Sequence, residues 1–69
     1  MNYTNSQIAE GIDEHIHNWV YRNILKDRLI NGMIYDELAE KYNYSVRQIK
    51  RIIYREEKVL FDGMKMSRS

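Results

Sequence analysis

The 69-residue sequence contains no cysteine, no proline and only three glycines. Without cysteine the chain has neither a disulfide nor a thiolate metal site, so its stability must come from packing or from a partner. The lack of proline and glycine leaves few interruptions for helices and few of the turn signals that a strand-rich fold needs. The composition therefore predicts an all-α fold, a compact bundle of three to four helices.

Long apolar runs are also missing. No segment is long enough for a membrane span or a signal peptide, so we expect a cytoplasmic protein without a membrane partner. A chain of this length forms one small domain, whose core leaves no room for an enclosed pocket. We therefore expect no enzyme, no catalytic residues and no cofactor. His15 and His17 stand two residues apart, which places them on different faces of a helix, so we expect no metal site.

Charge is distributed unevenly, although the formal net charge is only +1. Residues 1–44 carry four basic and seven acidic side chains, whereas residues 45–69 carry seven basic and three acidic ones. This polarity orients the C-terminal part toward a polyanion. Two solvated faces that merely differ in charge would give the same pattern and stay an alternative.

Apolar residues recur at every fourth position between residues 8 and 24. A spacing of four drifts around a helix of about 3.6 residues per turn, so we expect a bend between Asn18 and Asn23. Asn5 or Ser6 can cap the start, and Asn31-Gly32 can close the end. The first three residues of this series, together with the neighbouring Trp19, could form the seam of a homodimer or fill the core of one copy: Ile8, Ile12, Ile16 and Trp19.

The apolar pattern of residues 36–58 predicts two helices joined by a tight turn. Asn43 tolerates the left-handed conformation and is the expected turn residue, after which Ser45 can cap the second helix. We expect this helix to end at Asp62-Gly63, which gives a domain over residues 1–63 and a flexible tail over residues 64–69. The apolar face of the second helix consists of Val46, Ile49, Ile52 and Ile53.

The opposite side of this second helix is basic and is the predicted DNA-binding site. Arg47 and Arg51 are the candidates for reading guanine, and Gln48 could pair with adenine. Val46 could contact a thymine methyl group if it is not itself part of the core. Lys50, Arg55 and Lys58 are placed for phosphates. Tyrosines at helix ends more often pack against the core than contact a ligand. Packing is therefore the alternative role for Tyr44 and Tyr54. The predicted DNA-binding residues are Ser45, Val46, Arg47, Gln48, Lys50, Arg51, Tyr54, Arg55 and Tyr44.

The positions of Ala39, Asn43, Ile49 and Ile52 resemble those of a helix-turn-helix. Residues 24–39 carry a leucine- and arginine-bearing helix, a glycine and a Glu-Leu-Ala step. They are similar to the approach to the helix-turn-helix in region four of bacterial sigma factors and in small phage regulators. The resemblance covers about residues 20–60 and implies a sequence-preferring, double-stranded DNA-binding transcriptional regulator. Asn43 stands where the family commonly has glycine, and nothing resembles the rest of a sigma factor.

A second class of function stays open. Small phage-type proteins of this kind can act as inhibitors or adaptors that bind a host protein, such as RNA polymerase, a repressor or a defence nuclease. The basic helix would then meet an acidic protein surface. DNA binding should weaken steeply with salt, whereas protein binding should depend on one partner and on apolar anchors.

Overall fold

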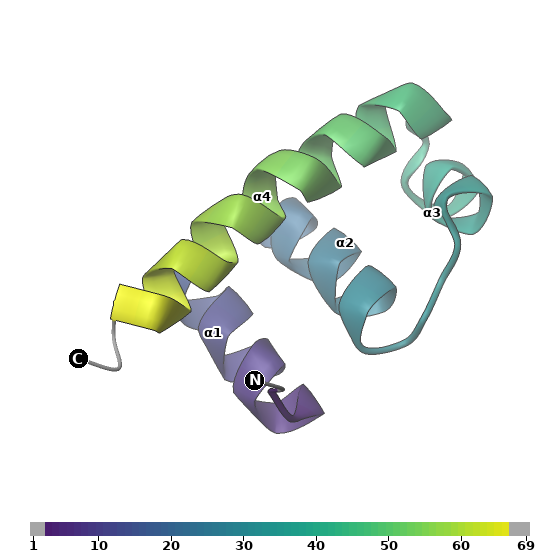
Figure 1. The fold of residues 1–69 in the computed structure, drawn as a ribbon. Helices are drawn as coiled ribbons and strands as arrows, with labels where there is room; N and C mark the ends of the chain where they lie inside the picture. The colour runs from purple at the N-terminus through teal and green to yellow at the C-terminus, as the bar shows by residue number, and fades with distance from the viewer. Residues whose placement is uncertain (1–2, 67–69) are drawn as a thin grey trace.

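The computed structural model describes residues 3–66, without the side chain of Met66. This part of the chain forms four α-helices and no strand, which confirms the all-α prediction: α1 (Asn5–His15), α2 (Trp19–Leu29), α3 (Tyr35–Tyr42) and α4 (Val46–Met66). α4 is the longest helix, with α3 at its N-terminal end, α1 at its C-terminal end and α2 between them (Figure 1). None of the described helices is both long and apolar enough to cross a membrane.

α1 begins with a reciprocal cap on Thr4 rather than on Asn5 or Ser6. The Thr4 Oγ1 accepts a hydrogen bond from the Gln7 backbone N at 3.1 Å, and the Gln7 Oε1 accepts one from the Thr4 backbone N at 2.9 Å. This exchange satisfies two backbone donors at the start of the helix. Local side-chain chemistry therefore sets the helix start, one residue before the expected cap.

The helix is interrupted at residues 16–18, and this interruption overlaps the expected bend between Asn18 and Asn23 only at Asn18. Asn18 caps α2, since its Oδ1 accepts hydrogen bonds from the backbone N of Val20 and Tyr21. Arg22 reaches back to α1, where its guanidinium donates to the carbonyl oxygens of Ile16 and Asp13. These bonds satisfy carbonyls that the end of a helix leaves without a partner.

Nine buried apolar side chains form the core of the described residues: Ile12, Ile16, Ile24, Leu25, Leu38, Ile49, Ile53, Leu60 and Met64. Ile12 and Ile16 are at most 1% exposed, so neither is available for the predicted dimer seam. Ile8 is half-buried against the core. Trp19 is 69% exposed, which contradicts the alternative that it fills the core of one copy. The break after α1 explains this, because Trp19 starts a new helix and leaves the stripe of the first one.

α4 does not end at Asp62-Gly63, as the sequence had suggested, but continues to Met66. Met64 is buried, so the predicted tail over residues 64–69 is wrong for residues 64–66, and residues 67–69 lie outside the described part. The reason is close packing against α1. A Cβ on Gly63 would lie 2.5 Å from the His15 Nδ1, and one on Gly11 2.7 Å from the Met64 Sδ. Glycine thus permits the contact, and the packing offsets its helix cost of about 1 kcal/mol.

Candidate nucleic-acid interface

The turn between α3 and α4 is centred on Asn43. Asn43 has φ 61° and ψ 42°, a left-handed conformation that no other non-glycine residue in the described part adopts at positive φ. The backbone N of Asn43 and that of Tyr44 both donate to the Ala39 carbonyl oxygen, the latter at 2.9 Å. The turn prediction is confirmed, because asparagine adopts this conformation more readily than most residues.

Ser45 and Gln48 cap the start of α4. The Ser45 Oγ accepts a hydrogen bond from the Gln48 backbone N at 3.1 Å, and the Gln48 Oε1 accepts one from the Ser45 backbone N at 2.9 Å. The predicted cap on Ser45 is therefore present as a capping box. It also occupies the side-chain oxygen of Gln48, a residue that the sequence analysis had assigned to adenine.

Asp27 of α2 holds α3 in place through hydrogen bonds to residues next to the turn. Its carboxylate accepts hydrogen bonds from the Asn31 Nδ2 at 2.8 Å, the Lys41 Nζ at 2.7 Å and the Tyr42 hydroxyl at 2.5 Å. Burial alone would raise the pKa of Asp27, but the bonds from Lys41, Tyr42 and Asn31 outweigh it and the pKa lies below its usual value. Burial, the bond to Asp27 and its negative charge raise the pKa of Tyr42.

Sequence reasoning missed Asp27, although a signal was present. Asp27 follows the buried Ile24 by three residues, so it lies on the inward stripe of α2. A carboxylate on an inward stripe requires hydrogen-bonding partners. Two of the three partners, Lys41 and Tyr42, come from α3, which no local pattern could identify.

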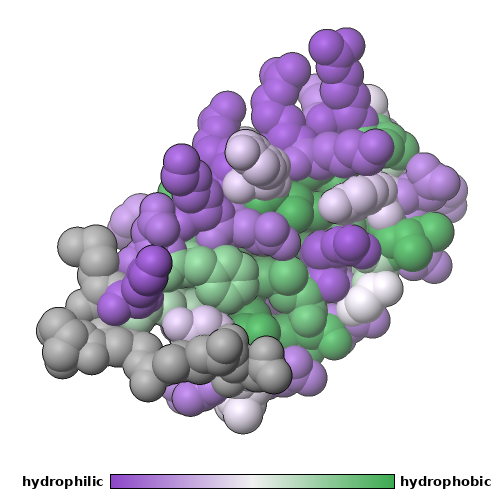
Figure 2. Space-filling view, viewed as in Figure 1, coloured by the Kyte–Doolittle hydropathy of each residue, from purple (hydrophilic) through white to green (hydrophobic). Residues whose placement is uncertain are grey.

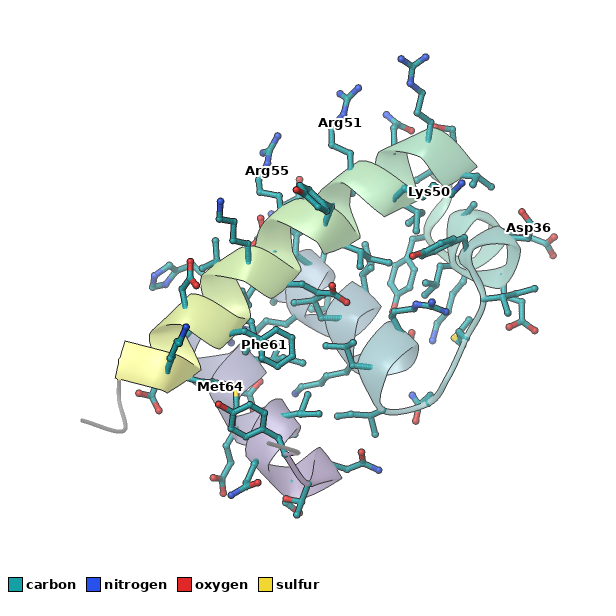
Figure 3. The ribbon with its side chains drawn as sticks, viewed as in Figure 1. Asp36, Lys50, Arg51, Arg55, Phe61 and Met64 are labelled. Atoms are coloured by element: carbon teal, nitrogen blue, oxygen red, sulfur yellow. The ribbon has the colours of Figure 1, made fainter. Side chains whose placement is uncertain are left out.

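Tyr35 connects three helices through contacts with cations. The Arg28 guanidinium lies 4.5 Å and the Lys50 ammonium 5.6 Å from the centre of the Tyr35 ring. The Lys50 side chain is exposed but directed toward α3 (Figure 3). Lys50 therefore differs from the arginines of α4, for which the described part of the chain shows no contact between a cation and an aromatic ring.

Arg47, Arg51, Arg55 and Lys58 form the cationic face of α4. All four side chains are exposed. Their spacing of four, four and three residues places them on one side of the helix. Arg51 and Arg55 point away from the other helices (Figure 3), and hydrophilic side chains line this edge of the molecule (Figure 2). The ion pairs found among the described residues involve other cations: His15, Lys26 and Lys41.

The remaining predicted site residues differ in exposure. Tyr54 is 78% exposed and lies in a shallow depression of α4 together with Val59, which is 45% exposed. Tyr44 is half-buried and packs against the core, which supports the packing interpretation for this tyrosine. Val46 is half-buried at the first position of α4. Of the two candidate tyrosines, Tyr54 is therefore the one whose side chain is exposed on α4.

α3 presents charges of the opposite sign. Asp36, Glu37 and Glu40 are exposed on this helix (Figure 3 labels Asp36). A polyanion that approaches the molecule would therefore be attracted to α4 and repelled by the outer side of α3. The exposed carboxylates of α3 thus contrast with the cationic face of α4.

Comparisons with protein-family models, with curated proteins and with solved structures give no match to this chain. The similarity to region four of sigma factors therefore stays a prediction from the sequence. Among the described residues, no three His, Asp or Glu side chains are grouped in a way that could hold a metal ion.

Proposed function

We propose that this chain binds double-stranded DNA as a helix-turn-helix protein, with the N-terminal part of α4 in the major groove. The observation that carries the proposal is the cationic face, four exposed cations without an ion-pair partner among the described residues. Neutralising phosphates with such cations releases counterions and supplies most of the non-specific affinity for DNA. A short preceding helix that braces the second one is the arrangement of helix-turn-helix proteins.

Position along α4 assigns the roles. Arg47 lies in the first turn and Arg51 in the second, and residues near the start of a recognition helix contact base edges. Arg55 and Lys58 lie farther along the cationic face and are assigned to phosphates, which supply affinity and register without sequence information. A sequence-preferring protein of this kind would regulate transcription, the role that the resemblance implies.

The test is fluorescence anisotropy of a labelled random-sequence duplex at about 50 mM and about 200 mM salt. We expect binding that collapses over this range. Arg55→Gln should reduce the slope of log affinity against log salt by about one unit, the loss of one phosphate contact. No binding of the wild-type protein at the lower salt would overturn the proposal.

Lys26→Gln is the matched control for Arg55→Gln, because it removes one positive charge elsewhere. Lys26 pairs with Asp13 at 2.8 Å, between α1 and α2. A surface pair of this kind contributes little to stability, so the variant should stay folded. Its salt slope should equal that of the wild type. A similar reduction in both variants would indicate a general charge effect and contradict the assignment of Arg55.

The exposed apolar groups on α4 favour a second candidate function, an inhibitor or adaptor that binds an acidic surface of a host protein. Tyr54 and Val59 lie in one depression with Arg51 and Arg55. Tyrosine and arginine are enriched among the residues that dominate the energy of protein interfaces. In that case Tyr54→Ala should abolish capture of a partner such as RNA polymerase or a defence nuclease. DNA binding should then be absent at low salt.

A further inference from the structure

We infer that the DNA site is specified by two guanines in the major groove, read by Arg47 and Arg51, and that Gln48 and Lys50 read no base. The inference rests on the proposed DNA binding. It is carried by the contacts that these four side chains make, or do not make, within the molecule.

Gln48 is committed to the cap of α4. Pairing with adenine requires its amide oxygen to accept from the adenine amino group while its amino group donates to N7. That oxygen already accepts from the Ser45 backbone N at 2.9 Å. Turning it toward a base would break one of the two hydrogen bonds of the capping box. The adenine assignment made from the sequence is therefore replaced.

Lys50 is directed away from the cationic face. Its ammonium lies 5.6 Å from the centre of the Tyr35 ring on α3. Arg28 of α2 contacts the same ring. A cation held near an aromatic ring of α3 is placed beside the bracing helix rather than toward the groove that α4 would enter. Lys50 can still attract phosphate there, but it does not reach a base edge without leaving Tyr35.

Arg47 and Arg51 have no competing partner among the described residues. A guanidinium presents donors in a planar fork that matches the O6 and N7 acceptors of guanine, and no other base offers two acceptors on its major-groove edge. We therefore assign guanine as the base that Arg47 and Arg51 bind.

The spacing of the two arginines limits the spacing of the two guanines. Four residues correspond to about 6 Å along a helix. Base pairs are stacked about 3.4 Å apart, so the two arginines reach over at most about two base-pair steps. The guanines should therefore be adjacent or separated by one base pair. Arg55 lies about 12 Å from Arg47 along α4, which is consistent with a phosphate rather than a third base.

The experiment selects bound duplexes from a random library and then replaces each selected guanine by 7-deazaguanine, which removes the N7 acceptor but keeps base pairing. We expect selected sites with two guanines within three consecutive base pairs, on either strand. Each replacement should weaken binding about tenfold, as for loss of one arginine–guanine contact. In Arg51→Gln, one of the two replacements should have no further effect.

Gln48→Ala is the second variant, because it removes one of the two hydrogen bonds of the capping box without touching either arginine. It should lower the thermal midpoint but select the same sites as the wild type. Selected sites without guanine, equal sensitivity to 7-deazaguanine in wild type and Arg51→Gln, or a changed site in Gln48→Ala would each overturn the inference. Absence of binding to any duplex would instead overturn the proposed function.

Discussion

The two ends of α4 are held in different ways. The N-terminal end, residues 46–58, begins at a local cap on Ser45 and carries the exposed cationic face. The C-terminal end, residues 59–66, is held by α1, with Leu60 fully buried and Gly63 directly beneath the His15 ring. The start of the first end is therefore set by adjacent residues, although Ile49 and Ile53 on its inner side also pack in the core, whereas the second end is held by residues about fifty positions earlier in the chain. Only the outer side of the first end is thus available for binding.

Leu60→Ala should break the C-terminal end most severely. Leu60 is fully buried, so truncation should lower the free energy of unfolding by about 3 kcal/mol. Its neighbour Val59 is 45% exposed, so Val59→Ala should cost less than about 0.5 kcal/mol. Urea titration followed by circular dichroism measures both variants. Equal losses would mean that the C-terminal end is not docked as described.

Asp27→Asn should weaken the attachment of α3 to α2, and α3 packs against the N-terminal end of α4. Replacing the carboxylate weakens the bonds from Lys41, Tyr42 and Asn31, with an expected loss of about 2 kcal/mol at pH 7. The folded-state pKa of Asp27 is lowered, so its contribution is present above the unfolded value of about 4 and is lost as the pH falls through the folded value. The gap between wild type and variant should therefore shrink in acid.

Asp13→Asn is the control for the acid dependence. The hydrogen bond from Lys26 lowers the pKa of Asp13 as well, but this pair is exposed to solvent, which screens it. Urea titrations between pH 2 and pH 7 should show the smaller change for this variant. The role of Asp27 would be refuted by a gap to wild type that stays constant down to the lowest pH.

Gly63→Ala tests the close contact between α4 and α1. Alanine favours the helix by about 1 kcal/mol, but its Cβ would lie 2.5 Å from the His15 Nδ1. We expect no net stabilisation in the wild-type background. In a His15→Ala background the same substitution should stabilise by about 1 kcal/mol, because the obstacle is gone. Thermal melts of the wild type, the two single variants and the double variant measure this double-mutant cycle. The same stabilisation by Gly63→Ala in both backgrounds would contradict the contact.

Arg51→Gln should sharpen the comparison by having the smallest effect on folding. Arg51 is exposed and has no ion-pair partner in the described residues, so the free energy of unfolding should change by less than about 0.5 kcal/mol. A urea titration measures this change beside the DNA-binding assay. A large loss of stability would show that the cationic face has a structural role.

The same contrast explains which parts of the fold the sequence could predict. Asn43 and Ser45 act through hydrogen bonds to residues within four positions, so the turn and the helix start were predicted correctly. Gly63 breaks helices by local rules, yet it lies inside α4 because α1 packs on it. Local propensity is overridden where contacts distant in sequence supply more free energy.

The candidate site was predictable in part. The periodicity of Ile49 and Ile53 placed the arginines on the outer side, where the structure has them. It could not reveal that Gln48 caps the helix or that Lys50 lies against Tyr35, because these depend on side-chain conformation and on a neighbouring helix. Face assignment follows from the backbone period, whereas the availability of a side chain follows from its contacts.

The arrangement of the helices also has a consequence for the order of folding during synthesis. α1 and α3 make no contact with each other within the described residues, and α4 contacts both. A chain that leaves the ribosome from its N-terminus can pair α1 with α2 early, but its core cannot close until Leu60 and Met64 have emerged. Of the four described helices, the one proposed to bind DNA is made last, so nascent chains lack a finished binding surface until translation has passed Met64.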